Sequence, residues 1–135
     1  MGGYEIIEHT ADVGIEATAP TLEGVFERTA RGLFDIMGAW DPGPGEPTSI
    51  VLEPADDAGL LVDWLNELLF VQDTQDIVFT ALDVGKVDGD GLRATIGTRS
   101  RSSTLDGTAV KAATFHRLKV AEEGGVWTAR VYLDV

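Results

Sequence analysis

Alternation of apolar and polar residues predicts that much of the chain forms short β-strands. A period of two is typical of a strand with one face in the core, because successive side chains point to opposite faces. The sequences Asp88-Gly89-Asp90-Gly91 and Glu122-Glu123-Gly124-Gly125 are suited to the tight turns of two hairpins. Strands are accordingly expected at residues 4–9, 13–18, 49–53, 77–87, 92–97, 110–120 and 126–133.

Two segments have the spacing of helices instead. Apolar residues recur three and four positions apart from Leu22 onward, which predicts a helix with Thr21 as its N-cap and an end near Gly38. A second helix is expected to begin at Asp56 or Asp57 and to direct a dense apolar stripe toward the core. That stripe comprises Leu60, Leu61, Trp64, Leu65, Leu68 and Leu69.

The order of these elements predicts an α+β fold. Residues 40–47, which are rich in proline and glycine, are expected to form an exposed loop, and residues 98–107 a polar, hydroxyl-rich segment. Hairpins dominate the C-terminal half, so we expect a largely antiparallel sheet with two helices packed on it. A length of 135 residues is typical of one domain, here residues 1–135.

The composition and net charge restrict the kinds of partner that the chain is expected to bind. The chain has 23 acidic and 10 basic residues and a formal net charge of −13, so direct nucleic-acid binding, which depends on lysine and arginine, is not expected. This charge reflects either a solvated surface or a basic partner. The absence of cysteine excludes disulfides and thiolate metal sites. With no signal-peptide pattern and no apolar run of about 18 residues, we expect a cytoplasmic protein that does not bind membranes.

Candidate chemistry first occurs in Glu8-His9-Thr10-Ala11-Asp12, where an imidazole, a hydroxyl and two carboxylates share a short bend. Such residues also hydrogen-bond a turning backbone, and that structural role is an alternative. In the alternation that follows, Asp12 has the parity of Glu16 and the opposite parity to Ile15. Its carboxylate is therefore expected on the face directed away from the core.

A second group of carboxylates lies at the other end of the sequence. Asp134 has the strand parity of Arg130, and the α-carboxylate of Val135 is one strand step away. If the first and last strands pair, Asp12 joins these two anions in an oxygen-rich site suited to a hard cation such as Ca²⁺ or Mg²⁺. The alternative is a frayed terminal segment in solvent.

Lys111 is the only lysine or arginine of residues 110–116. It is either an edge-strand lysine that discourages aggregation or a counter-ion or partner contact near the acidic site. Other motifs do not support catalysis. The turn at residues 88–91 lacks the glutamate that a calcium loop needs at its twelfth position, and neither a phosphate-binding glycine motif nor a GxSxG elbow occurs. The remaining basic group, Arg93, Arg99 and Arg101, is expected in a solvated loop.

Several of these segments resemble the archease family. The resemblance extends from residue 4 to the end of the chain, with departures in two places: the family commonly has Gly-Glu near residues 96–99 and often a histidine within residues 102–106. The matching segments are Glu8-His9-Thr10-Ala11-Asp12-Val13-Gly14-Ile15, Leu60-Leu61-Val62-Asp63-Trp64-Leu65-Asn66-Glu67-Leu68-Leu69, Val110-Lys111-Ala112-Ala113-Thr114-Phe115-His116 and Leu133-Asp134-Val135.

The resemblance implies an α+β fold, a bound divalent metal and no catalytic activity of its own. Archease-like proteins promote guanylylation and multiple turnover of the RtcB-type RNA-splicing ligase in tRNA splicing. Carried over by position, the metal ligands are Asp12, Asp134 and Val135, with Ca²⁺ expected and Mg²⁺ or Mn²⁺ as alternatives, while His9 and Lys111 are candidate partner contacts. A second role suggested for the family is a chaperone-like modulator of RNA-modifying enzymes such as methyltransferases.

Overall fold

The computed structural model of the protein describes residues 2–8 and 12–135, and its elements follow the order expected from the sequence. The helices are α1 (Leu22–Met37) and α2 (Asp57–Gln75). The strands are β1 (Gly3–Glu8), β2 (Asp12–Ala19), β3 (Glu46–Leu52), β4 (Ile77–Asp88), β5 (Gly91–Ser100), β6 (Ala112–Glu123) and β7 (Val126–Asp134). The predicted α+β class is confirmed.

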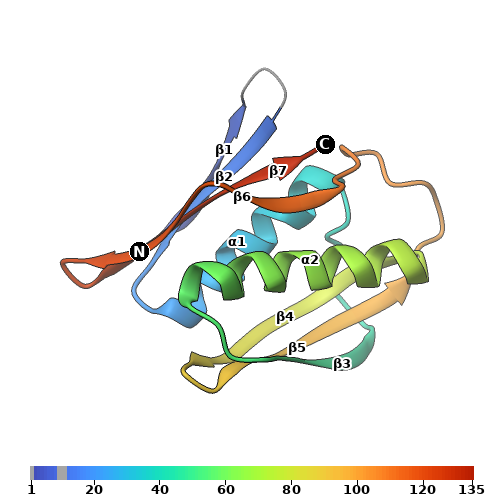
Figure 1. The fold of residues 1–135 in the computed structure, drawn as a ribbon. Helices are drawn as coiled ribbons and strands as arrows, with labels where there is room; N and C mark the ends of the chain where they lie inside the picture. Colours follow the sequence, from blue (N-terminus) through green and yellow to red (C-terminus); the bar gives the residue numbers. More distant parts are fainter. Residues whose placement is uncertain (1, 9–11) are drawn as a thin grey trace.

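The strands form two antiparallel sheets, and the helices lie between them (Figure 1). The first sheet has the strand order β1-β2-β7-β6 and the second the order β3-β5-β4. α1 packs on β1, β2 and β7 on one side and on β4 on the other, while α2 packs on β6 and on all three strands of the second sheet. Because α2 is covered on two sides, Val62 and Val71 are buried in addition to the six residues of the predicted stripe.

Local signals at the helix ends act as the sequence predicts. The side chain of Thr21 accepts a hydrogen bond from the Gly24 N–H at 3.0 Å, and that of Asp56 accepts one from the Gly59 N–H at 2.8 Å. α1 ends at Gly38, whose φ of 67° lies in the left-handed region that favours glycine. These boundaries are therefore fixed by chemistry that the sequence displays.

The boundaries of β3 and β5 show why some strand ends differ from the sequence prediction. β3 begins at Glu46 rather than at residue 49 and includes Pro47, which is tolerated because β3 is an edge strand with one side unpaired in the sheet. β5 continues beyond residue 97 because Thr98 pairs with both Glu46 and Phe79. The central position of β5, between two partners, thus extends the strand into residues whose polarity indicated a loop.

Buried contacts join the helices to each other and to the second sheet. The indole Nε1 of Trp64 in α2 donates a hydrogen bond to the carbonyl of Phe26 in α1 at 3.1 Å, and both residues are fully buried. Phe34 of α1 stacks on Phe79 of β4 with ring centroids 4.0 Å apart. The two helices and β4 therefore form one packed unit on which the first sheet rests.

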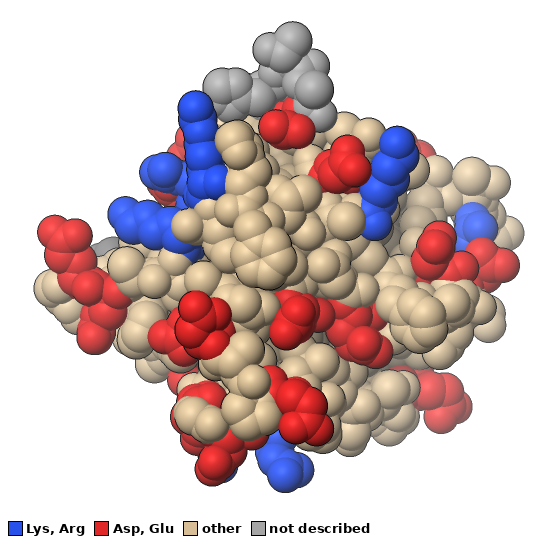
Figure 2. All heavy atoms as spheres, viewed as in Figure 1, with Lys and Arg blue, Asp and Glu red and all other residues tan. Residues whose placement is uncertain are grey.

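α2 turns a narrow polar stripe to solvent. Asp63 and Asp73 are exposed on it, and Glu67 is half-buried. Figure 2 shows acidic side chains spread across the middle of this face, where Figure 1 shows α2. Within the described residues, neither helix has an apolar stretch that would allow it to span a bilayer.

Glutamates of α1 cover the free edge of β4. Glu27 accepts a hydrogen bond from the Val84 N–H at 3.2 Å, and Glu23 accepts one from the Val87 N–H at 3.1 Å. These bonds satisfy backbone donors that would otherwise be available to another strand. Burial raises the pKa of the Glu27 carboxyl, an effect that the bond from Val84 opposes only in part.

We predict that Glu27→Gln stabilises the protein at about pH 7 by less than about 1 kcal/mol, because glutamine keeps the acceptor for Val84 and has no charge to desolvate. The raised pKa means that the folded state favours the protonated acid, so the advantage of the variant disappears below the ordinary pKa of 4.5. Urea denaturation at about pH 7 and about pH 4 measures this difference. The control Glu27→Ala, which loses the acceptor, should be less stable than Glu27→Gln at both pH values. A Glu27→Gln variant less stable than wild type at pH 7 would contradict the prediction.

Candidate functional site

A row of cross-strand pairs between β2 and β7 lies on the outer face of the first sheet. Asp12 lies opposite Asp134, and Glu16 lies opposite Arg130. Ile15 points to the other face and is fully buried, so the Asp12 side chain leaves on the face away from the core. The last strand pairs with the second strand, which contains Asp12, and not with the first strand, whose pairing the sequence analysis considered.

Asp12 and Asp134 are two like charges held directly opposite each other. Farther along the row the charges are complementary, and Arg130 Nη2 lies 2.8 Å from Glu16 Oε2. No ion pair within residues 2–8 and 12–135 includes Asp12 or Asp134. Directly opposed side chains have Cβ atoms about 5 Å apart, and like charges at that separation repel. The arrangement therefore favours a cation between the two carboxylates.

The donor set at this edge fits a hard divalent cation. Carboxylate oxygens are the ligands that Ca²⁺ and Mg²⁺ prefer, and Asp12 and Asp134 place two of them on one face. Val135, the third residue of the predicted set, follows directly and is 37% exposed. Among the described side chains, no group of three histidines, cysteines, aspartates or glutamates could hold a metal. The predicted set of Asp12, Asp134 and Val135 therefore stays a prediction.

An aromatic side chain supports the acidic pair from the next position of the row. Tyr132 lies opposite Gly14, and a Cβ atom added to Gly14 would be only 2.9 Å from the Tyr132 ring. The ring therefore covers the glycine, and Tyr132 is buried although it lies on the outer face. Thr114 Oγ1 donates a hydrogen bond to the Tyr132 carbonyl at 2.9 Å. These contacts hold the strand segment that ends at Asp134.

The predicted contact residues have different outcomes. Lys111 precedes β6, which begins at Ala112 rather than at residue 110, so placing Lys111 inside the strand was wrong. Its backbone N–H nevertheless donates to the Asp134 carbonyl at 2.8 Å, and its side chain is exposed. Lys111 is thus tied to the acidic edge through its main chain. His9 lies outside the described residues.

β6 departs from regular pairing after Thr114. Residues 115–118 form a bulge that breaks the register with β7, and Arg117 adopts a φ of 51° within it. In a regular strand, Phe115 would lie on the same face as Ala113. The bulge removes that alternation, so Ala113 is buried whereas Phe115 is 69% exposed.

Asn66 has a structural role at the site that the sequence analysis did not assign. Its side-chain amide accepts a hydrogen bond from the Ala113 N–H at 2.8 Å and donates one to the Ala113 carbonyl at 3.4 Å. The adjacent residue of β6, Ala112, is the partner of Asp134. Asn66 therefore anchors the end of the sheet that holds the acidic pair. The sign of this role in the sequence is an amide side chain next to the apolar stripe of α2.

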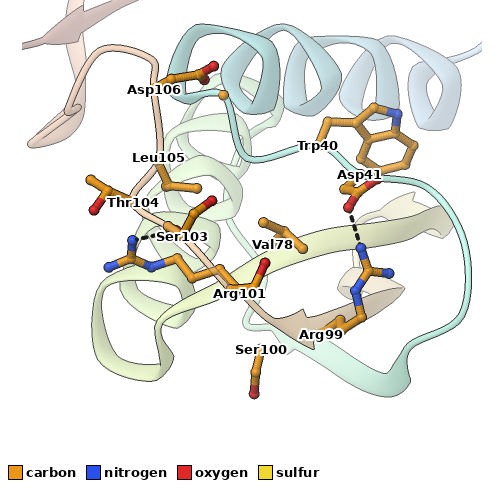
Figure 3. Close-up of a pocket in the computed structure, with 12 residues that line it drawn as sticks. Trp40, Asp41, Val78, Arg99, Ser100, Arg101, Ser103, Thr104, Leu105 and Asp106 are labelled. Carbon is orange, nitrogen blue, oxygen red and sulfur yellow. Dashed lines mark hydrogen bonds and ion pairs between the residues drawn. The ribbon is translucent and has the colours of Figure 1, made fainter.

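The arginines near the end of β5 line a separate cavity of about 280 Å³ (Figure 3). Arg99 forms an ion pair with Asp41 on one side of it. Arg101 lies 3.1 Å from Asp76 and donates to the Ser103 carbonyl at 3.0 Å. Acidic partners thus neutralise both guanidinium groups, which does not favour a polyanion in this cavity.

Comparisons with known proteins give one family. The model of the Archease protein family (MTH1598/TM1083) matches residues 4–135. The protein archease of Methanothermobacter thermautotrophicus is 38% identical over 142 residues, with 100% of both chains covered. The solution structure of Methanobacterium thermoautotrophicum protein 1598 is 35% identical, with a TM-score of 0.73 over 98% of this chain and 99% of that chain. The crystal structure of an archease, possible chaperone, from Thermotoga maritima is 24% identical, with a TM-score of 0.68 over 97% and 96% of the two chains, and shows the fold alone.

We predict that Asp134→Asn stabilises the metal-free protein by about 0.5 kcal/mol, because it removes the repulsion from Asp12 across the strands. Urea denaturation in the presence of a chelator measures the effect. Glu16→Gln is the matched control, since it removes one carboxylate of the same row and breaks an attractive pair with Arg130 instead. It should lower the stability. If both variants shift stability in the same direction, the two aspartates do not repel each other in the folded protein.

Proposed function

The chain belongs to the archease family, and we propose that it is a non-catalytic activator of an RtcB-type RNA ligase. The proposal is supported by the pair Asp12 and Asp134, two opposed carboxylates without a basic partner in the described structure. A protein with a net charge of −13 is poorly suited to bind RNA itself but well suited to a basic enzyme. The activator therefore acts on the ligase and leaves the RNA chemistry to it.

The acidic edge is proposed to hold one divalent cation, with Ca²⁺ as the first candidate and Mg²⁺ or Mn²⁺ as alternatives. Asp12, Asp134 and the α-carboxylate of Val135 would be its ligands from this chain, in agreement with the preference of such ions for oxygen. A bound cation would supply positive charge and could coordinate a phosphate or carboxylate oxygen of the partner. Tyr132 and Asn66 hold the strand ends that position the ligands.

In the proposed complex, the acidic edge docks beside the active site of the ligase and promotes guanylylation of its nucleophile. Lys111 and His9 are proposed partner contacts at this edge. The backbone bond from Lys111 to Asp134 keeps this exposed residue at the end of the sheet that carries the carboxylates, where its side chain can pair with an anion of the complex. Affinity that depends on charge complementarity is expected to weaken with salt.

A second candidate is a chaperone-like modulator of RNA-modifying enzymes such as methyltransferases. The observation that favours it is the description of the Thermotoga maritima relative as a possible chaperone. The two candidates differ in what the acidic edge does, because a general chaperone does not require a cation held by Asp12 and Asp134. Protection of a methyltransferase from aggregation by the Asp12→Asn and Asp134→Asn variants would favour this candidate.

We predict that Asp12→Asn and Asp134→Asn each lower stimulation of multiple-turnover RNA ligation by at least about tenfold, which is a loss of about 1.4 kcal/mol. The assay uses the cognate ligase, GTP and a split RNA substrate, with and without this protein. Glu123→Gln is the matched control, because it removes a charge at the opposite end of the same sheet. It should stimulate as wild type does. Full stimulation by both aspartate variants would refute the role of the acidic edge.

Direct metal binding is tested separately from ligation. Titration of Ca²⁺ into the metal-free protein by calorimetry should show one site, and a concentration of 100 times Kd should stabilise the fold by about 2.7 kcal/mol. Asp134→Asn should abolish both signals, whereas Glu123→Gln should keep them. Mg²⁺ and Mn²⁺ are titrated in parallel to identify the preferred ion. No heat and no stabilisation with any of the three ions would refute the metal proposal.

A further inference from the structure

A groove of about 670 Å³ lies between the C-terminal half of α2 and the segment that leads into β6. Its size is in the range of sites that enclose a small ligand or a few side chains. The lining combines apolar with polar and charged side chains. It includes Asn66, Leu69, Phe70, Gln72, Asp73, Ala109, Val110, Lys111, Ala112 and Val135.

Phe70 is an apolar residue on the polar stripe that α2 turns to solvent. It is 62% exposed, whereas Leu69 beside it is almost completely buried. The other members of the stripe include Asp63, Glu67 and Asp73, spaced three or four residues apart from one another or from Phe70. A phenyl ring within an acidic stripe costs free energy in water, and packing does not require it there. Aromatic side chains are enriched at protein–protein interfaces, so this exposed ring indicates a surface that binds another protein.

The groove lies at the same end of the first sheet as the acidic edge. Lys111 and Val135 line the groove, and the Lys111 N–H is bonded to the carbonyl of Asp134. The Asp12 and Asp134 side chains lie on the outer face of the sheet, whereas the groove lies on the side where α2 packs. The acidic edge and the groove are thus separate surfaces at one end of the sheet, and a single protein partner can contact both.

We propose that this groove receives a basic segment of the RNA ligase, with one apolar side chain of that segment packed against Phe70. The proposal rests on the function proposed above and names the part of the protein that supplies affinity, as distinct from the edge that supplies activation. Glu67 and Asp73 lie one helical turn on either side of Phe70, and Asp63 lies one turn beyond Glu67. Their carboxylates would pair with lysine or arginine side chains that neighbour the apolar anchor of the segment.

Charge argues for this occupant over two others. A second copy of this chain would bring another net charge of −13 to an acidic face, which is unfavourable without a cation between the copies. A nucleic acid would be repelled by the same carboxylates. A basic segment gains from both the apolar ring and the surrounding charge, and the ring at the centre of the contact would be the residue whose loss costs most.

The test compares Phe70→Ser with Phe115→Ser. Both side chains are exposed phenyl rings, 62% and 69% respectively, so neither change should unfold the protein, and the melting temperature checks this. Phe70 lines the groove, whereas Phe115 lies in the β6 bulge outside it. We expect Phe70→Ser to raise the Kd for the ligase at least about tenfold, and Phe115→Ser to leave it within about twofold. Equal effects of the two substitutions would overturn the proposal.

Charge reversal provides an independent measurement. Asp73→Lys should weaken binding at low salt, and the difference from wild type should shrink as salt increases. Hydrogen exchange should show slower exchange at residues 66–73 and 109–112 in the complex than in the free protein. Absence of both effects would overturn the groove as the docking site.

The binding and stimulation measurements together distinguish failure of the groove proposal from failure of the proposed function. If Asp134→Asn abolishes stimulation while Phe70→Ser binds and stimulates as wild type, the groove is not the docking site and the activator function stands. If wild type neither binds nor stimulates the ligase, the proposed function fails, and the groove proposal fails with it. Loss of affinity in Phe70→Ser, with stimulation restored at a saturating concentration of the variant, supports both.

Discussion

The structure depends on one constraint: the two helices lie between two sheets and must pack against both. α2 therefore cannot have a single apolar face, and Val62 and Val71 are buried outside the stripe that helical spacing indicates. The buried indole N–H of Trp64 needs a hydrogen-bond acceptor, and the Phe26 carbonyl provides it. A helix so enclosed has few positions left for solvent, and the residues at those positions become the surface on which a partner can act.

The same constraint determines the geometry of the acidic edge. Ile15 and Val131 are opposite each other in β2 and β7 and are both fully buried, so the helices fix the register of these strands. A slip by one residue would turn the two buried side chains outward and would also separate Asp12 from Asp134. The opposed carboxylates are thus maintained by packing on the far side of the sheet, although their own interaction is unfavourable without a cation.

Local patterns in the sequence were sufficient to predict the helices and strands, but they were not sufficient to predict how these elements assemble. The cap at Thr21, the core stripe of α2 and the outward parity of Asp12 follow from short spacings, and sequence displays them directly. The division into two sheets, the pairing of β2 with β7 and the bulge after Thr114 depend on contacts between distant segments. Asn66 illustrates the limit, because an amide in a helix acquires its role only when an edge strand is placed beside it.

The pairing of Asp12 with Asp134 joins positions that are 134 − 12 = 122 residues apart. Contacts over such a separation form late, since the entropy of closing a long loop must be offset by structure that already exists. During synthesis, β2 leaves the ribosome long before its partner β7 and meets it only after both helices and the second sheet have been made. The proposed cation site is thus assembled only when the fold is complete, and a partially synthesised chain lacks the opposed carboxylates.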